Sequence, residues 1–315
     1  MRTAATQLED PFVHPALFYR DDAEYLAGTV GFITEGLEAG EPVAVSVPGA
    51  KLRLLRAELG DAQDRVQFFD MTEVGRNPGR IIPGVLRAFA DKHPGRRVRI
   101  IGEPIWPTRT DTEYPACVQH EALINHAFTG REVSILCPYD TAGLSEQALR
   151  DAVATHPILI DSSGQRASDG YAPDRIVDSY NLPLAVPPLT AQQMTVQPGS
   201  LRTVRWLTAE CGHRIGFPPD RLDDLLMAVT ELASNSIEHG GGTGTMHLWA
   251  DGPELVCQVS DRGHITDPLV GRTPREPHRT SGRGLLMVNH VADLVRMHTG
   301  PDGTTIEIRF VFHSS

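Results

Sequence analysis

The stretch Glu231-Leu-Ala-Ser-Asn235-Ser-Ile-Glu-His239-Gly240 is the most informative part of this chain. Glu231 and Asn235 are four residues apart, so they lie on the same face of an α-helix. A carboxylate and a carboxamide placed in this way can hold a magnesium ion, which keeps most of its waters and accepts one or two protein oxygens. For the pair alone, an ordinary solvated helix face is the alternative interpretation.

The residues before this stretch predict one long amphipathic helix. It starts at Pro219 with Asp220 as its N-cap. Glu231, Asn235 and Glu238 fall on or beside the edge opposite to the apolar stripe, so we expect the stripe to face a sheet. The stripe consists of Leu222, Leu225, Leu226, Val229, Leu232 and Ile237.

The rest of the second half predicts an α+β sandwich, because helices and an antiparallel-type sheet are segregated along the chain. Helices are expected at residues 200–211 and 283–295, and strands at residues 244–250, 255–260 and 304–312.

Three short motifs follow the long helix: Asp261-Arg-Gly263 at a strand end, Gly282-Arg283-Gly284-Leu285 opening a helix, and Gly303-Thr304-Thr305 before the last strand. Alone, the first is typical of a strand-end turn and the second of a flexible loop. In this order, together with the helix, they resemble the ATP-binding apparatus of the GHKL (Bergerat-fold) family. The similarity is to its anti-sigma regulatory factor and serine-protein kinase branch, and it covers residues 190–315.

The resemblance implies a role for each matching residue. Asn235 would be the Mg²⁺ ligand, and Glu231 would orient or deprotonate the attacking hydroxyl. Asp261 would accept a hydrogen bond from the adenine amino group, and Gly263 would let the backbone approach the base. The triphosphate would lie against the glycine-rich turn at a helix N-terminus. The residues implied there and at the closing strand are Gly282, Arg283, Gly284, Leu285 and Thr304.

Residues 266–281 would form the lid over the nucleotide. This chain has Ile265 where the family has the second glycine of the Asp261 motif. This substitution puts in question how the lid hinges and how tightly the nucleotide is bound. His239 follows the helix as in the family, and we expect it to cap the helix end.

The implied partners are proteins. No helical segment with a phospho-accepting His precedes the ATP region, which disfavours a sensor histidine kinase. The resemblance implies γ-phosphoryl transfer to a Ser or Thr of a STAS anti-anti-sigma partner, or ATP-dependent sequestration of a sigma factor. A catalytically inactive module that binds ATP or sequesters a sigma factor is the alternative. A chaperone or topoisomerase subunit is disfavoured, because no transducer domain follows the ATP site.

The first half alternates short apolar strands with amphipathic helices, which predicts an α/β domain with a mostly parallel sheet. Residues 161–189 are rich in proline and predict a linker. The expected domains are therefore residues 1–160 and 190–315. Strands are expected at residues 43–47, 66–69, 98–102 and 133–137, and helices at residues 22–38, 51–59, 79–92 and 114–128.

Four segments of the first half resemble the MEDS (methanogen/methylotroph DcmR) sensory domain. They are His14-Pro-Ala-Leu-Phe18-Tyr19-Arg20-Asp21-Asp22, Gly102-Glu103-Pro104 with Trp106, Leu136-Cys137-Pro138-Tyr139-Asp140, and Thr155-His156-Pro157. The resemblance implies a RecA-like fold with a degenerate P-loop. Residues 45–52 lack the GxxxxGK[ST] pattern, so no ATP is expected there.

The MEDS family is proposed to sense hydrocarbon-derived molecules, which implies a pocket for a small organic ligand. Strand ends and the loops after them are where open α/β sheets bind ligands. The structural alternatives are that the aromatic residues belong to the core, that Cys137 is a buried thiol and that Asp140 caps a helix. A His, Cys and Glu trio could also bind a metal, although neither the spacing of these residues nor a helix pair supports it. The candidate residues are His14, Tyr19, Glu103, Trp106, Cys137, Tyr139 and Asp140.

Composition narrows the class further. The chain carries 29 Lys and Arg against 40 Asp and Glu, a net charge of -11, without a basic stripe, so no direct nucleic-acid binding is expected. Its four cysteines have no metal-ligand spacing and indicate reduced thiols of a cytoplasmic protein. No apolar run approaches the roughly 20 residues that span a bilayer, and no signal-peptide core is present, so no membrane contact is expected. A homodimer is left open.

Overall fold

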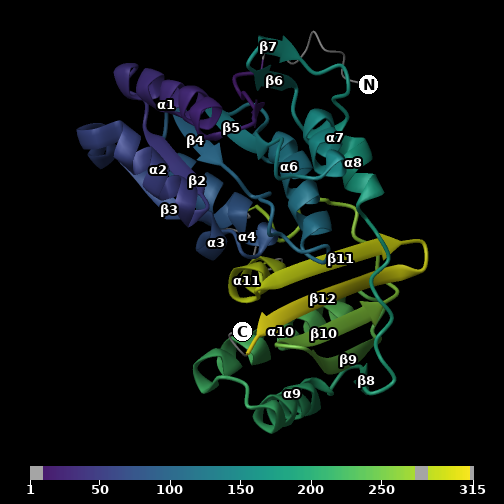
Figure 1. Ribbon diagram of the computed structural model, residues 1–315. Coiled ribbons are helices and arrows are strands. Elements are labelled where there is room, and N and C mark those ends of the chain that lie inside the picture. Colours follow the sequence, from purple (N-terminus) through teal and green to yellow (C-terminus); the bar gives the residue numbers. More distant parts are fainter. Residues whose placement is uncertain (1–9, 274–282, 313–315) are drawn as a thin grey trace. The chain divides into compact units, whose positions relative to one another are not determined.

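The computed structural model describes residues 10–273 and 283–312. The chain divides into two compact units, Met1–Tyr180 and Asn181–Ser315, each with its own sheet (Figure 1). In the described ranges, every helix is either too short or too polar to cross a bilayer.

The first unit is built on a seven-stranded sheet with the order β3-β2-β4-β5-β1-β6-β7. All neighbouring strands are parallel except β6 and β7, which form an antiparallel hairpin. The predicted mostly parallel α/β arrangement is therefore confirmed. The strands are β1 Pro15–Tyr19, β2 Val43–Val47, β3 Val66–Asp70, β4 Val98–Gly102, β5 Val133–Asp140, β6 Ile158–Asp161 and β7 Gly164–Ala167.

Helices cover both faces of this sheet (Figure 1). On one face, α1 (Asp22–Glu38) and α2 (Gly49–Leu59) pack with Leu17, Val45 and Leu136 into one apolar cluster. Because side chains alternate along a strand, the neighbours of these residues point to the opposite face. The other helices of the unit are α6 Tyr114–Phe128, α7 Glu146–Thr155 and α8 Pro173–Ser179, with the short η2 Gly60–Arg65, α3 Met71–Val74, α4 Pro78–Ile81, η3 Ile82–Arg87 and α5 Ala88–Ala90.

Two segments of the first unit differ from the sequence expectation. The helix expected at residues 79–92 is broken into α4, the π-helical η3 and α5, because Pro83 lacks the N–H that a regular helical turn requires. Residues 161–180, expected to be linker, form β7 and α8 within the unit. β7 is exposed along its whole length and α8 buries only Ile176, so neither carries an apolar period.

The second unit is a five-stranded antiparallel sheet with the order β11-β12-β10-β9-β8. The apolar stripe of α10, including Leu225, Val229 and Leu232, packs against Cys257 of β10 and Ile308 of β12. The predicted α+β sandwich is confirmed. The strands are β8 Gln192–Val196, β9 Gly244–Asp251, β10 Glu254–Asp261, β11 Leu294–Gly300 and β12 Gly303–Val311, and the helices are α9 Leu201–Ile215, α10 Pro219–Glu238 and α11 Gly284–Val291.

The helix expected at residues 283–295 is too long. It ends at Val291, and Leu294–Gly300 forms β11, which pairs with β12 across a tight turn. Pairing with β12 along the whole length of β11 overrides the local helical pattern. The cap of α10 also differs, because Pro218 is the N-cap residue and Asp220 lies in the first turn, where its charge still complements the helix dipole.

Candidate functional site

The polar edge of α10 faces the first turn of α11. A Cβ placed on Gly284 would lie 2.3 Å from Glu231 Oε2 and 3.7 Å from Asn235 Nδ2. Any larger residue at this position would therefore force the Glu231 carboxylate or the start of α11 to move. The first turn of a helix has N–H groups without intrahelical partners, so a carboxylate, a carboxamide and free amides converge here.

Asp261 is fixed at the end of β10, in register with Gly244 of β9 and Thr304 of β12. Its Oδ2 accepts a hydrogen bond from Ser236 Oγ at 2.5 Å, and its Oδ1 accepts one from the Gly263 N–H at 2.8 Å. Ser236 directly follows Asn235 in α10, so the end of the helix and the end of the strand are joined beside the predicted metal ligand.

The closing Gly303-Thr304 pair supports the turn after Asp261. Thr304 is buried, and its Oγ1 donates a hydrogen bond of 2.9 Å to the Gly263 carbonyl. Gly303 has a φ of 129°, and a Cβ there would lie 1.9 Å from the Asp261 carbonyl oxygen, so this position requires glycine. The structure thus brings together Asp261, Gly263 and Thr304, three predicted residues that come from two separate motifs.

Ile265 is held in place where the family pattern has a glycine. Its N–H donates to Thr299 Oγ1 of β11 at 3.1 Å, and its side chain packs against the core of the unit. Further along the expected lid, Asn289 of α11 donates a 3.0 Å hydrogen bond to the carbonyl of Gly271, which has a φ of 69°. The residue before the lid is therefore tied to β11, and the described part of the lid is tied to α11.

The glycine-rich turn is described only in part. Arg283 is the N-cap residue of α11 and its side chain is exposed, whereas Leu285 is partly buried and packs against the core. Gly282 and residues 274–281 of the expected lid lie outside the described residues. His239 is the C-cap residue of α10, and its backbone N–H bonds the Asn235 carbonyl at 2.7 Å.

In the first unit, the seven predicted pocket residues do not share one cavity, because the sheet separates them. Tyr19 and Glu103 lie on the face covered by α1 and α2, where the Tyr19 hydroxyl donates to Glu103 Oε1 at 3.3 Å. Lys51 Nζ lies 4.9 Å from the centroid of the Tyr19 ring. Burial raises the pKa of Glu103 to about 8, although Lys51 opposes the shift.

Trp106 and Asp140 take part in local contacts after the strands. The Arg109 guanidinium stacks on the Trp106 ring at 3.9 Å. Asp140 Oδ1 accepts hydrogen bonds from the N–H groups of Ala142 and Gly143, which closes the turn after β5. Asp140 therefore caps a turn, which is close to one of the structural alternatives inferred from the sequence.

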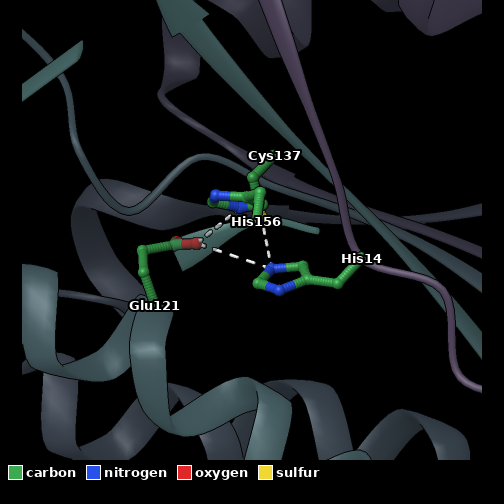
Figure 2. Close-up of side chains that lie close together, drawn as sticks. All are labelled: His14, Glu121, Cys137 and His156. Atoms are coloured by element: carbon green, nitrogen blue, oxygen red, sulfur yellow. Dashed lines mark hydrogen bonds and ion pairs between the residues drawn. The ribbon is translucent and has the colours of Figure 1, made fainter. Parts of the chain in front are cut away.

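His14, Cys137 and Tyr139 lie on the face that α6 covers. His14 Nε2 is 3.4 Å from Cys137 Sγ, and the two residues meet Glu121 of α6 and His156 (Figure 2). The Tyr139 ring centroid is 5.4 Å from that of His156. Burial, followed by the nearby His156, lowers the pKa of His14 to about 4. Neither Glu121 nor His156 was predicted as a site residue, because they lie on α6 and at the end of α7, both distant in sequence from His14.

Comparisons with known proteins agree with the two units. Residues 13–157 match the family described as MEDS: MEthanogen/methylotroph, DcmR Sensory domain, and residues 194–310 match the histidine kinase-like ATPase domain. Serine-protein kinase RsbW from Halalkalibacterium halodurans is 30% identical over 121 residues, which are 33% of this chain and 74% of that protein. Both resemblances drawn from the sequence are therefore confirmed.

A structural comparison gives one further match. The crystal structure of the RsbU and RsbW domains of Rv1364c from Mycobacterium tuberculosis is 22% identical with a TM-score of 0.31. The match covers 41% of this chain and 34% of that one, so the chain spans about a third of that protein.

Proposed function

Because the chain belongs to the histidine kinase-like ATPase family that includes serine-protein kinase RsbW, and has a MEDS domain before its ATPase domain, we propose that its second unit is an ATP-binding anti-sigma regulator with serine-protein kinase activity. Its cofactors would be ATP and Mg²⁺. The observation that carries the proposal is the close approach of Gly284 to Glu231 and Asn235. It sets helix amides, which favour phosphate, opposite a carboxylate and a carboxamide, two side chains whose oxygen atoms suit Mg²⁺.

The described residues fit the nucleotide in a defined way. Asp261 would accept a hydrogen bond from the adenine amino group, since two donors already orient its carboxylate. Thr304 would hold the Gly263 turn beside the base. The amides at Gly284 and the exposed Arg283 would take the triphosphate. Asn235 would supply the metal ligand, and the bound ion would neutralise charge on the phosphates.

Transfer to a partner would then depend on Glu231. Its carboxylate would accept the proton of a Ser or Thr hydroxyl on the partner while the hydroxyl oxygen bonds to the γ-phosphorus and ADP leaves. Most of the rate would come from positioning and charge stabilisation. We propose a STAS anti-anti-sigma protein as the acceptor and a sigma factor as the protein held in the nucleotide-bound state.

A module without phosphoryl transfer is the second candidate, and Ile265 favours it. Its N–H bonds β11 and its side chain joins the core, so the start of the lid has less freedom than a glycine would allow. Such a module would still bind ATP and hold a sigma factor.

For the first unit we propose a sensor of a small organic molecule. The ligand must bind one state of the protein better than another, because equal affinity would shift nothing. We also take the sheet as RecA-like with a lost phosphate site. In support, a Cβ on Gly49 at the start of α2 would lie 2.6 Å from Asp70 Oδ2, so a carboxylate lies close to this helix N-terminus and would repel a phosphate there.

Two variants of the full chain test the kinase proposal. Asn235→Ala should weaken Mg²⁺-dependent ATP binding, measured by calorimetry, because it removes the metal ligand. Glu231→Ala should bind ATP as the parent does, yet transfer no label from radiolabelled ATP to a STAS-domain protein. Glu210→Ala, an exposed carboxylate of α9, is the matched control.

Label on a serine of the STAS protein would support the kinase. Tight sigma-factor binding without any label would support the inactive module instead. Equal loss of ATP binding in Asn235→Ala and Glu231→Ala would show that the assigned roles are wrong.

A further inference from the structure

Four buried side chains of the first unit converge on one point (Figure 2). His14 precedes β1, Glu121 lies on α6, Cys137 lies on β5, and His156 joins α7 to β6. None of the four is more than 1% exposed. One nitrogen, sulfur or oxygen atom from each lies within 4.8 Å of the corresponding atoms of the other three.

The hydrogen bonds around His14 define which ring nitrogen carries its proton. Asn125 donates through Nδ2 to the carbonyls of Thr155 at 2.8 Å and Ala122 at 3.1 Å. Its Oδ1 is therefore the acceptor that faces His14 Nδ1 at 3.1 Å. Because Nδ1 must donate there, the neutral ring has a lone pair on Nε2, on the side of the cluster.

His156 is arranged in the same way. Its Nδ1 lies 2.9 Å from the Ala152 carbonyl oxygen, which can only accept, so Nδ1 carries the proton. Its Nε2 lone pair points to Glu121 Oε2 at 3.1 Å, and His14 Nε2 lies 3.6 Å from the same oxygen. Two lone pairs and a carboxylate that face each other without a positive centre would repel.

The cluster also leaves polar atoms unsatisfied. In the part of the chain that the structure describes, neither oxygen of Glu121 nor His156 Nε2 has a partner with hydrogen-bond geometry. Buried polar atoms without partners cost free energy, and a bound cation would satisfy His156 Nε2 and one oxygen of Glu121 at once.

We propose that His14, Glu121, Cys137 and His156 bind one divalent transition-metal ion, with zinc as the ion that fits best. A thiolate, two imidazoles and a carboxylate are ligands that zinc accepts in tetrahedral sites. A thiolate and a carboxylate also cancel the two positive charges of the ion, so the buried site would be neutral. Bond lengths of roughly 2.0–2.3 Å put tetrahedral ligand atoms roughly 3.3–3.8 Å apart. The contacts of 3.4 Å and 3.6 Å already fall in that range.

The site would be structural, since four protein ligands fill a tetrahedron and no position remains for water or substrate. The Ala152 carbonyl and Asn125 would act as the outer partners that orient both imidazoles. On binding, Cys137 Sγ bonds to the ion and its thiol proton passes to solvent. The ion would tie β1, β5 and α6 together, so its binding should raise the stability of the first unit.

Zinc content and Co²⁺ spectra test this proposal on the full chain, stripped with a chelator and reloaded. The expected results are one Zn²⁺ per chain by elemental analysis and, with Co²⁺, a thiolate-to-metal charge-transfer band in the near ultraviolet. Cys137→Ser should remove that band and weaken Zn²⁺ binding about 100-fold or more. The matched control is Cys117→Ser, since Cys117 is equally buried and lies on α6 outside the cluster.

A second variant, Glu121→Gln, keeps the test decisive if Cys137→Ser fails to fold, because glutamine has nearly the same shape as glutamate. The Glu121→Gln chain should lose Zn²⁺ affinity, while circular dichroism shows that it is folded. A parent chain that gives no charge-transfer band with Co²⁺, or that retains no Zn²⁺, overturns the proposal. Unchanged Zn²⁺ affinity in both Glu121→Gln and Cys137→Ser overturns it as well, and the cluster would then be a buried His–Glu pair.

Discussion

Ser236 Oγ donates a hydrogen bond of 2.5 Å to Oδ2 of Asp261 and joins the last turn of α10 to the end of β10. Ser236 is buried, and the second oxygen of Asp261 is bonded to the Gly263 N–H. The carboxylate is therefore oriented before any ligand arrives. A preorganised acceptor binds more tightly than one that must be ordered on binding.

Removing this preorganisation should weaken nucleotide binding. Asp261→Asn should lower the affinity of the full chain for ATP with Mg²⁺ by about 10- to 100-fold, because an acceptor for the adenine amino group is lost. Ser236→Ala should lower it by a smaller factor, about 3- to 10-fold, since Asp261 keeps its charge. Calorimetry measures both, with Asp223→Asn on the exposed side of α10 as the control. If Asp261→Asn binds ATP as tightly as the parent chain does, Asp261 does not contact the adenine.

Gly284→Ala should disturb the approach of α11 to α10. The new methyl group would lie 2.3 Å from Glu231 Oε2, so either the carboxylate or the helix must move. We expect ATP affinity to fall about 10-fold or more and stability to fall by about 1–3 kcal/mol. Gly300→Ala is the matched control, because its nearest neighbouring atom would be 3.6 Å away. Equal ATP affinity in the two variants would contradict the assignment of this turn to the triphosphate.

Glu103 should make the first unit less stable as the pH rises. Its pKa of about 8 in the folded chain lies above the ordinary 4.5, so the folded state retains a proton that the unfolded state releases. The stability that this retained proton contributes to the folded chain is complete below pH 4.5 and is lost as the pH rises through about 8. It amounts to a few kcal/mol at most, since one pKa unit is about 1.4 kcal/mol.

Hydrogen exchange of the β4 peptide at several pH values measures that slope. Glu103→Gln stays neutral and should flatten it, whereas the exposed Glu58→Gln should not. A slope that persists in Glu103→Gln would assign the pH dependence to another group.

Arg309 should be essential for the stability of the second unit. Its guanidinium donates to Glu307 Oε1 at 2.8 Å, and Glu307 is fully buried and also bonds Gln258 at 2.7 Å. Arg309→Leu leaves that carboxylate without its main cation and should cost about 3–5 kcal/mol. Urea denaturation followed by the fluorescence of Trp249 measures the loss. Arg202→Leu, an exposed position on α9, should change stability little. A similar loss in both variants would argue against the buried pair as the cause.

Local patterns predicted much of this protein. The helices at residues 22–38 and 114–128 and the strands at residues 43–47 and 98–102 lie where the periodicity placed them. The polar edge of α10 was also predictable, because a four-residue step defines one helix face regardless of context. By contrast, β8 and β11 were not predicted. β8 exists through pairing with β9, a strand distant along the chain, and β11 exists through pairing with β12 across a tight turn that the local helical pattern did not reveal.

The sequence by itself determined the order of the nucleotide motifs and both family resemblances, since each single motif consists of residues close together in the chain. Only the tertiary structure decided which side chains meet. It placed Tyr19 and Cys137 on opposite faces of the sheet, and it brought Glu121 and His156 to His14. Strand order and helix packing set those encounters over more than 100 residues of separation, and local periodicity carries no information on them.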